Sequence, residues 1–166
     1  MILTERLRLR ELTAADAPFI LELLNDDDFH RYIGDRGVRT LADAEDYIQQ
    51  GPAVSYARYG HGLYLVMRRE DGARLGICGL IKRDSLEDVD IGYAFLPAYR
   101  GQGYGIESAR AALQDGRERL GIERVVAIVT PGNERSIGLL AKLGLSQGRL
   151  VKLGEDEEEC LLLERA

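Results

Sequence analysis

The sequence contains few of the side chains that build metal centres and disulfide frameworks. Among its 166 residues there are two cysteines and two histidines. Cys78 and Cys160 lie far apart without a C-x-x-C spacing, and His30 and His61 add no metal-ligand pattern. We therefore expect two free, mostly structural thiols and no metal site.

Long hydrophobic runs and an excess of positive charge are also missing. No uninterrupted apolar stretch approaches the roughly 20 residues that a membrane span needs. The opening M-I-L-T-E-R-L-R-L-R alternates leucine with charge, unlike the apolar core of a secretory signal. The formal net charge of −6 gives no general attraction for phosphate backbones. These absences predict a cytoplasmic protein that neither crosses a membrane nor binds nucleic acid.

What the composition does contain fits one ordinary globular domain. Hydrophobic residues make up 45% of the chain and charged residues 30%, enough to form a core and a solvated surface. No internal repeat, low-complexity region or linker interrupts the sequence, so we expect a single domain over residues 1–166. Its acidic charge would suit a cationic partner such as an amine, although solubility is the commoner meaning of such a charge.

Hydrophobic periodicity predicts strands and helices that alternate around one mixed sheet. The strands are expected at residues 7–11, 63–69, 74–82, 89–96, 125–129, 150–153 and 160–163. The helices are expected at residues 17–24, 40–50, 105–120 and 136–143. Asp71-Gly72 is a strong hairpin signal between two of the strands, and residues 29–38 and 155–159 have the composition of loops. The pattern indicates an α/β (α+β) fold.

The richest chemical signal is the stretch D-I-G-Y-A-F-L-P-A-Y-R-G-Q-G-Y-G at residues 90–105. It places a strand, a glycine-rich loop and a helix start in succession. Glycines let the backbone wrap closely around a ligand, and a helix N-terminus carries about half a positive charge. With Arg100 as a fixed cation beside it, the loop is suited to a pyrophosphate.

Two common phosphate motifs do not fit this stretch. A dinucleotide fingerprint G-x-G-x-x-G that begins at Gly101 would need its third glycine where Ile106 stands, and a P-loop needs a G-K-[ST] that is absent. A glycine-rich turn that only caps a helix remains an alternative interpretation.

The segment R-G-Q-G-Y-G from Arg100 matches the pattern Q/R-x-x-G-x-G/A, and on this basis the sequence resembles the GCN5-related N-acetyltransferase (GNAT) superfamily. Three further segments look like its RimJ/RimL-type subgroup of ribosomal-protein N-terminal acetyltransferases. They are T-E-R-L-R-L-R, D-I-G-Y and N-E-R-S-I-G-L-L-A-K-L-G-L. The resemblance spans nearly the whole chain.

This resemblance implies a mixed, mostly antiparallel, V-shaped sheet with about four helices. Its two central parallel strands, residues 89–96 and 125–129, would splay apart to admit acetyl-CoA. Backbone groups near Phe95 and Leu96 would pair with the pantetheine arm like an added strand, and Asn133 would bond the arm farther along. The residues expected to hold the pyrophosphate are Arg100, Gly101, Gln102, Gly103, Tyr104 and Gly105.

Two residues are candidates for proton transfer. Asp90 lies in the strand expected to face the acetyl group and would take the proton of the amine through water, although a solvated charge or an ion pair is the commoner role. Leu140 stands where many superfamily members have a catalytic tyrosine. RimL-type members instead have a serine at the position of Ser136, which would protonate or hydrogen-bond the CoA thiolate. Tyr93 and Tyr99 are possible substitutes, and a serine that only bonds backbone is the alternative.

The resemblance leaves the amine acceptor open. A protein α-amine has a pKa of about 7.8 and a lysine about 10.4, so an N-terminal acceptor demands less of the base. A small amine, including an amine-bearing antibiotic, is the second hypothesis, and a CoA-binding module without catalysis is the third. The acceptor is expected between the first two helices and residues 29–39, in a monomer or a homodimer.

Overall fold

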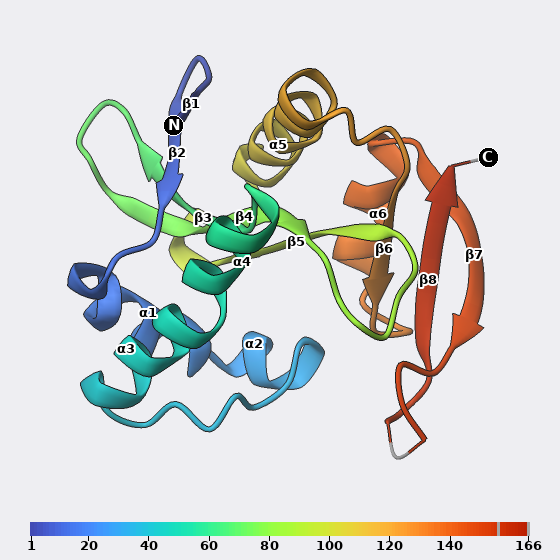
Figure 1. Cartoon of the computed structure of the whole chain (residues 1–166), viewed down its shortest axis with the longest axis horizontal. Helices are drawn as coiled ribbons and strands as arrows, with labels where there is room; N and C mark the ends of the chain where they lie inside the picture. Colours follow the sequence, from blue (N-terminus) through green and yellow to red (C-terminus); the bar gives the residue numbers. More distant parts are fainter. Residues whose placement is uncertain (156, 166) are drawn as a thin grey trace.

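The computed structural model describes residues 1–155 and 157–165, and within them an eight-stranded sheet runs through the molecule (Figure 1). Its order is β1-β2-β3-β4-β5-β6-β8-β7. The strands are β1 (Ile2–Leu3), β2 (Leu7–Glu11), β3 (Leu63–Arg68), β4 (Arg74–Ile81), β5 (Val89–Phe95), β6 (Val125–Val129), β7 (Leu145–Val151) and β8 (Cys160–Arg165). All neighbours pair antiparallel except β5 and β6, which are parallel. The expected mixed, mostly antiparallel sheet is confirmed.

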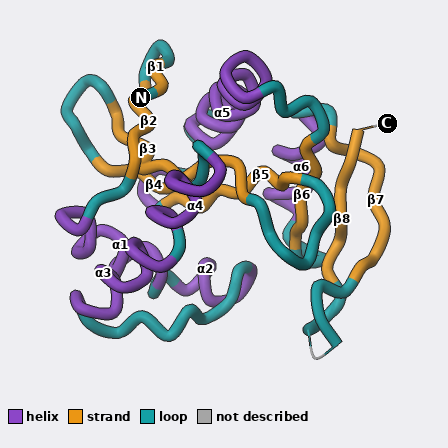
Figure 2. Tube along the Cα trace, in the orientation of Figure 1, coloured by secondary structure: helices purple, strands orange, loops and turns teal. Residues whose placement is uncertain are grey.

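Helices cover both faces of this sheet (Figure 2). They are α1 (Ala17–Leu24), α2 (Asp27–Tyr32), α3 (Leu41–Gln50), α4 (Pro52–Tyr59), α5 (Tyr104–Leu120) and α6 (Glu134–Lys142), with short 3-10 helices η1 (Ala14–Asp16) and η2 (Pro97–Tyr99). Alternate strand residues point to opposite faces. In β4, Cys78 belongs to the core beneath α5 and α6, whereas Ile77 belongs to the core beneath α1 and α3.

The two parallel strands diverge soon after they start. Their ladder consists of two register pairs, Val89 with Val125 and Asp90 with Val126, although β5 continues to Phe95 and β6 to Val129. At the end where β5 and β6 are paired, Arg124 forms ion pairs with both neighbours of β6. Its guanidinium lies 2.8 Å from the Asp88 carboxylate, directly before β5, and 2.5 Å from that of Glu164 in β8. The splayed pair expected from the sequence is therefore present.

The expected loop at residues 29–38 is partly helical, and that prediction was wrong in its first half. Helix α2 forms there because the Asp26 carboxylate accepts the Phe29 N–H at 3.2 Å and caps the helix, while the Phe29 ring is buried. Helix α3 ends at Gln50, as expected, and Pro52 begins the further helix α4, since a proline is well tolerated in a first helical turn.

The C-terminal strands also differ from the expectation in their bounds. Strand β7 begins at Leu145, whose side chain is buried, rather than near residue 150. Most of its other side chains are exposed, which explains why the hydrophobic pattern was weak there. Asp156, in the acidic run expected to join the last two strands, lies outside the described residues.

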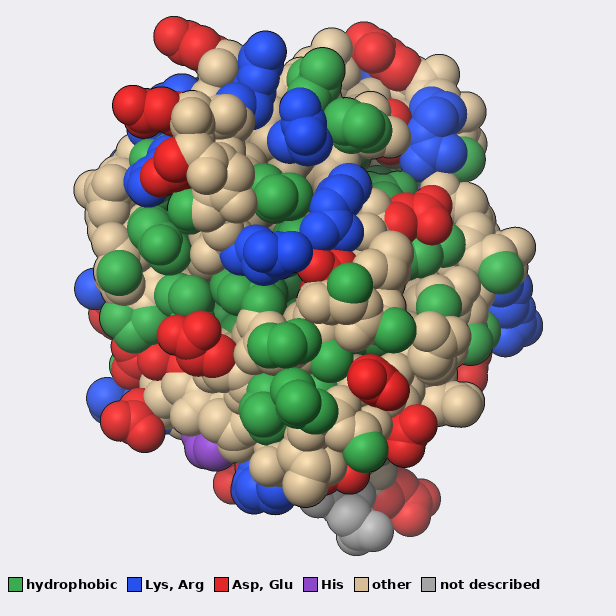
Figure 3. Space-filling view, turned by 90° about the vertical axis from the view of Figure 1, so that its left-hand side faces the viewer, with side chains coloured by type: hydrophobic (Ala, Val, Ile, Leu, Met, Phe, Trp, Pro, Cys, Tyr) green, Lys and Arg blue, Asp and Glu red, His purple; other side chains and the backbone are tan. Residues whose placement is uncertain are grey.

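On the face drawn in Figure 3, several basic side chains follow one another from the top toward the centre, and hydrophobic side chains with scattered acidic ones lie to their left and below. Across residues 1–155 and 157–165, no helix combines the length and the apolar character that a membrane crossing requires.

Candidate active site

The glycine loop, residues 100–105, leads from η2 into α5. Gly101 and Gly103 adopt φ values of +74° and +83°, which favour glycine, and Gly103 caps α5 without a side chain. The first helical amides therefore have no side-chain acceptor in front of them and can bind an anion. A Cβ at Gly105 would lie 2.8 Å from Leu139 Cδ1, so this glycine allows α5 to pack closely against α6.

Arg100 is directed away from these amides. Its Nη2 lies 2.7 Å from an Asp26 carboxylate oxygen, its Nη1 lies 2.6 Å from one of Asp28, and its Nε donates to the Phe95 carbonyl at 3.0 Å. Two carboxylates thus face this guanidinium, and the role of Arg100 as a cation beside a pyrophosphate stays a prediction.

Arg6, which precedes β2, also contacts the glycine loop, and the sequence did not predict this contact. Its Nη1 donates to the Gln102 carbonyl at 3.0 Å, its Nε pairs with Glu107 at 2.7 Å, and its guanidinium lies 4.4 Å from the centre of the Tyr104 ring. The Gln102 amide donates to the Ala98 carbonyl at 2.9 Å. No local spacing signals these contacts, since Arg6 and Gln102 are 96 positions apart.

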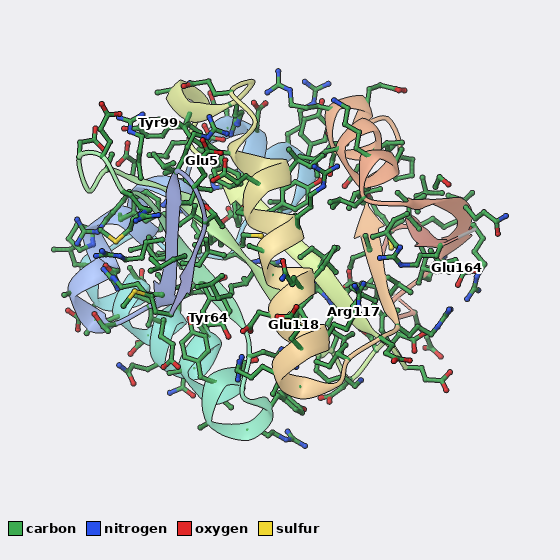
Figure 4. The ribbon with its side chains drawn as sticks, turned by 90° about the horizontal axis from the view of Figure 1, so that it is seen from above. Glu5, Tyr64, Tyr99, Arg117, Glu118 and Glu164 are labelled. Atoms are coloured by element: carbon green, nitrogen blue, oxygen red, sulfur yellow. The ribbon has the colours of Figure 1, made fainter. Side chains whose placement is uncertain are left out.

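Among the loop residues, Tyr104 has a buried side chain that belongs to the core beneath α5, with its hydroxyl 3.4 Å from Arg68 Nη1. Only its backbone stands at the helix start. Figure 4 shows Tyr99 and Glu5 near that end of α5, whereas Tyr64, Arg117 and Glu118 lie near the other end.

Phe95 and Leu96 end β5 with different backbone environments. The Leu96 N–H donates to the Leu75 carbonyl at 3.0 Å, and the Leu96 carbonyl accepts the Tyr99 N–H at 3.0 Å. Both backbone groups of Leu96 are thus engaged within the chain, and a contact of this residue with the pantetheine arm stays a prediction. Because neighbouring residues of a strand direct their backbone groups to opposite sides, those of Phe95 face away from β4, toward the gap before β6.

Tyr93 and Ser136 meet where the two strands have parted. The Tyr93 hydroxyl, from β5, lies 2.6 Å from Ser136 Oγ, at the start of α6. The Asn133 side chain caps α6 by accepting the Ser136 N–H at 3.3 Å. Burial raises the pKa of Tyr93 to about 12, against the hydrogen bond from Ser136, so this phenol is a proton donor at neutral pH. Leu140 is buried in the core of the same face.

Asp90 occupies the opposite face of β5, at the last paired position before the strands diverge. Strand alternation places it on the side of Ala94, which packs against the core beneath α1 and α3. One carboxylate oxygen accepts from Arg83 Nε at 3.0 Å, and the other has no hydrogen-bond partner within the described part of the chain. Burial raises the pKa of Asp90, against the attraction of Arg83 and Lys82.

The divergence of the strands therefore has a buried carboxylate on one face and a pair of hydroxyl groups on the other. Asp90 lies on the side of α1 and α3, and Tyr93 with Ser136 on the side of α5 and α6. This arrangement suits a reaction in which one group loses a proton and another gains one. Among residues 1–155 and 157–165, no cluster of three or more His, Cys, Asp or Glu side chains is arranged to hold a metal ion.

Comparison with known proteins agrees with this geometry. Residues 6–146 match the model of the acetyltransferase (GNAT) domain. The uncharacterized N-acetyltransferase YnaD of Bacillus subtilis (strain 168) is 27% identical over 144 residues, covering 87% of this chain and 81% of that protein. A structure described as a GNAT-family acetyltransferase from Bordetella pertussis has a TM-score of 0.81 and 26% identity, covering 100% of this chain and 99% of that one.

A more distant structure shares the fold alone. It is RimL, a ribosomal L7/L12 α-N-protein acetyltransferase in complex with coenzyme A, with a TM-score of 0.78 and 17% identity, covering 98% of this chain and 94% of that chain. The family match, which spans most of the sequence, decides the assignment. The chain belongs to the GNAT family of acetyltransferases.

Proposed function

We propose that the protein is an acetyl-CoA-dependent N-acetyltransferase, one domain over the chain, whose acceptor is a protein N-terminal α-amine. The family uses acetyl-CoA as donor. One observation carries the proposal: a buried carboxylate with a free oxygen and a Tyr–Ser pair lie on opposite faces of β5 where the sheet opens.

In this proposal the open amides of α5 receive the pyrophosphate of acetyl-CoA, and its pantetheine arm enters the gap between β5 and β6. The Phe95 N–H, directed into that gap, would bond the arm, and Asn133 would contact it from the start of α6. Arg6 lies beside the loop, where its guanidinium donates to the Gln102 carbonyl and also pairs with Glu107.

The chemistry follows from the two faces. Asp90 takes a proton from the acceptor ammonium through water, and the neutral nitrogen attacks the thioester carbonyl. The nitrogen, which carries an extra proton after the attack, releases that proton to water as the carbon–sulfur bond breaks. The sulfur leaves as a thiolate whose parent thiol has a pKa of about 8.5. Tyr93 and Ser136 stabilise or protonate that sulfur, because the phenol remains protonated at neutral pH.

The choice of an α-amine rests on the single carboxylate base. An α-amine with a pKa of about 7.8 is roughly a seventh neutral at pH 7, whereas a lysine near 10.4 is below a thousandth neutral. The fold-level likeness to RimL, which is named for an α-N-protein substrate, agrees with this choice. On this basis we place the chain nearest the RimJ/RimL type.

A thiol-release assay with acetyl-CoA tests the proposal. The acceptor panel contains peptides with free N-termini, the same peptides N-acetylated, peptides whose only free amine is lysine, and small amines. We expect release with free N-terminal peptides and none with their acetylated counterparts. Faster release with lysine peptides or small amines would overturn the acceptor, and CoA binding without release across the panel would overturn the activity.

In the same assay, Ser136→Ala and Tyr93→Phe test whether the Tyr93–Ser136 pair or a water molecule donates the proton to the thiolate. Each should lower turnover by about 10- to 100-fold, at or below the low end for acid–base catalysis, because a thiolate is already a fair leaving group. The dissociation constant of CoA should stay the same, since the pair acts mainly in the transition state. Full activity in both variants would assign the proton donor to water.

A further inference from the structure

Helix α2 lies across the gap between β5 and β6, and each of its ends contacts the segment that follows one of these strands. At its start, Asp26 and Asp28 pair with Arg100 of the glycine loop, which follows β5. At its end, the Tyr32 carbonyl accepts from Thr130 Oγ1 at 2.6 Å, directly after β6. One short helix therefore connects the two arms of the V, on the same side of the sheet as α1 and α3 (Figure 1).

The Arg100 guanidinium is largely buried and hydrogen-bonded on several of its N–H groups. Three of the five guanidinium N–H groups have partners, two of them charged, and the side chain is only 19% exposed. The Asp26 carboxylate oxygen that meets Arg100 also accepts the Phe29 N–H that caps the helix. An isolated helix of six residues is not stable in water, so the position of α2 depends on these contacts.

The helix lies on the face of the sheet that carries Asp90, where the proposed acceptor would approach. Phe29 of α2 belongs to the core beneath α1 and α3, against which Ala94 also packs, and strand alternation puts Asp90 on that same face of β5. A displacement of α2 would therefore alter the surface beside the proposed base rather than the amides of the glycine loop.

We propose that Arg100 is a positioning residue that holds α2 to the glycine loop, so that coenzyme A binding to the loop orders the acceptor side of the site. The inference rests on the proposed amine acetylation. Two bound sites that share one structural element affect each other through a coupling free energy. Arg100 supplies that element, because its guanidinium belongs to the loop and its partners belong to α2.

Three variants distinguish this role from a direct phosphate contact. Arg100→Gln removes the charge, and Asp28→Asn weakens the same contact from the side of α2. Asp27→Asn is the matched control, since Asp27 is exposed in the same helical turn and forms no ion pair within residues 1–155 and 157–165. Asp28→Asn keeps the Asp26 pair and the helix cap, so it remains informative if Arg100→Gln folds poorly.

The first measurement is the dissociation constant of free coenzyme A together with the KM of the acceptor. We expect the KM to rise about 10-fold in Arg100→Gln and Asp28→Asn, within the usual range of coupling between sites. The dissociation constant should change by less than about two-fold, and kcat should change less than KM. A CoA affinity lowered in Arg100→Gln but not in Asp28→Asn would overturn the proposal in favour of a phosphate contact.

The second measurement needs no acceptor, so it remains decisive if the proposed activity fails. Amide hydrogen exchange of α2 is compared with and without coenzyme A. We expect the coenzyme to slow exchange in the wild-type chain and in Asp27→Asn, and to slow it clearly less in Asp28→Asn, where only the Asp26 pair with Arg100 remains. Equal slowing in Asp28→Asn would show that the contact does not transmit binding.

Discussion

Two aspartates of this protein are almost fully buried, and their carboxylates have opposite surroundings. Asp16 is 0% exposed and Asp90 is 1% exposed. Asp16 accepts two hydrogen bonds of 2.9 Å from Arg10, one of 3.3 Å from Arg74 and one of 2.9 Å from the Thr13 N–H. These bonds join the start of α1 to β2 and β4, so Asp16 stabilises the packing of this helix against the sheet.

Asp90 has much less compensation for the same burial. Arg83 reaches one of its oxygens, and the other is unpartnered within the described residues. An unpaired buried polar atom costs about 1–3 kcal/mol, so a fold gains nothing from it. The two carboxylates therefore differ in hydrogen-bond satisfaction and not in burial, and this difference supports a structural role for Asp16 and the proposed role of a base for Asp90.

The strongest test of the comparison is Asp90→Asn. We expect turnover at pH 7 to fall about 100-fold, the low end for the loss of a general base, while the fold persists because asparagine has the same shape. Raising the pH should partly rescue the rate near the acceptor pKa, about 7.8 for an α-amine and about 10.4 for a lysine, since solution then supplies the neutral amine.

The control for that experiment is Asp88→Asn, two positions earlier, where the carboxylate is partly exposed and pairs with Arg124. This variant should retain its activity. A pH–rate profile of Asp90→Asn that runs parallel to the wild type would contradict the role of a base.

Asp16→Ala should lower the stability of the fold and leave turnover unchanged, the reverse of what we expect for Asp90→Asn. Loss of the Asp16 carboxylate leaves Arg10 and Arg74 without their partner, and we expect the free energy of unfolding to fall by about 3 kcal/mol, the low end for a broken buried ion pair, because both arginines are partly exposed. Turnover per folded molecule should not change. Denaturant unfolding and the thiol assay measure the two quantities.

Asp46→Ala, on the exposed surface of α3, is the control and should alter the free energy of unfolding by less than about 0.5 kcal/mol. If Asp16→Ala abolished turnover without loss of stability, Asp16 and Asp90 would not differ in role as the contacts indicate.

Local features of the fold were predictable from the sequence. Asp71-Gly72 turns the hairpin as expected, with Gly72 at a φ of +73°, and strand β6 has the predicted bounds. Helix α6 covers Glu134–Lys142, close to the expected residues 136–143, and Asn133 caps it. Each of these depends on neighbouring residues, so propensity and periodicity carry the information.

Long-range contacts were not predictable in the same way. Tyr93 and Ser136 were separate candidates in the sequence, and their 2.6 Å contact joins residues 43 positions apart. Helix α2 was missed because it is short and its position depends on Arg100, 72 positions after Asp28. Pairing partners at such distances follow from the register of the sheet, which periodicity alone does not give.

The smallest expected effect is a difference in how the two carboxylates contribute to the free energy of unfolding as the pH changes. Burial would raise the pKa of Asp16, but the bonds from Arg10, Thr13 and Arg74 bring it below its ordinary value. Its stabilising contribution is therefore present above the unfolded pKa, about 3.9, and is lost as the pH falls. For Asp90 the pKa is raised by burial, so its contribution is present at low pH and is lost as the pH rises through the folded value.

The two variants should consequently show opposite trends in unfolding free energy relative to the wild type. As the pH rises from about 2 to about 5, Asp16→Asn should become progressively more destabilised, because the wild-type carboxylate gains its ionised contacts over that range; at higher pH its destabilisation should stay constant. Above the unfolded pKa of about 3.9, Asp90→Asn should become progressively less destabilised as the pH rises, because it avoids the cost of burying a charge. Urea unfolding at several pH values measures both trends. Parallel trends would mean that the free oxygen of Asp90 finds a partner in solution, and the distinction between the two carboxylates would then be lost.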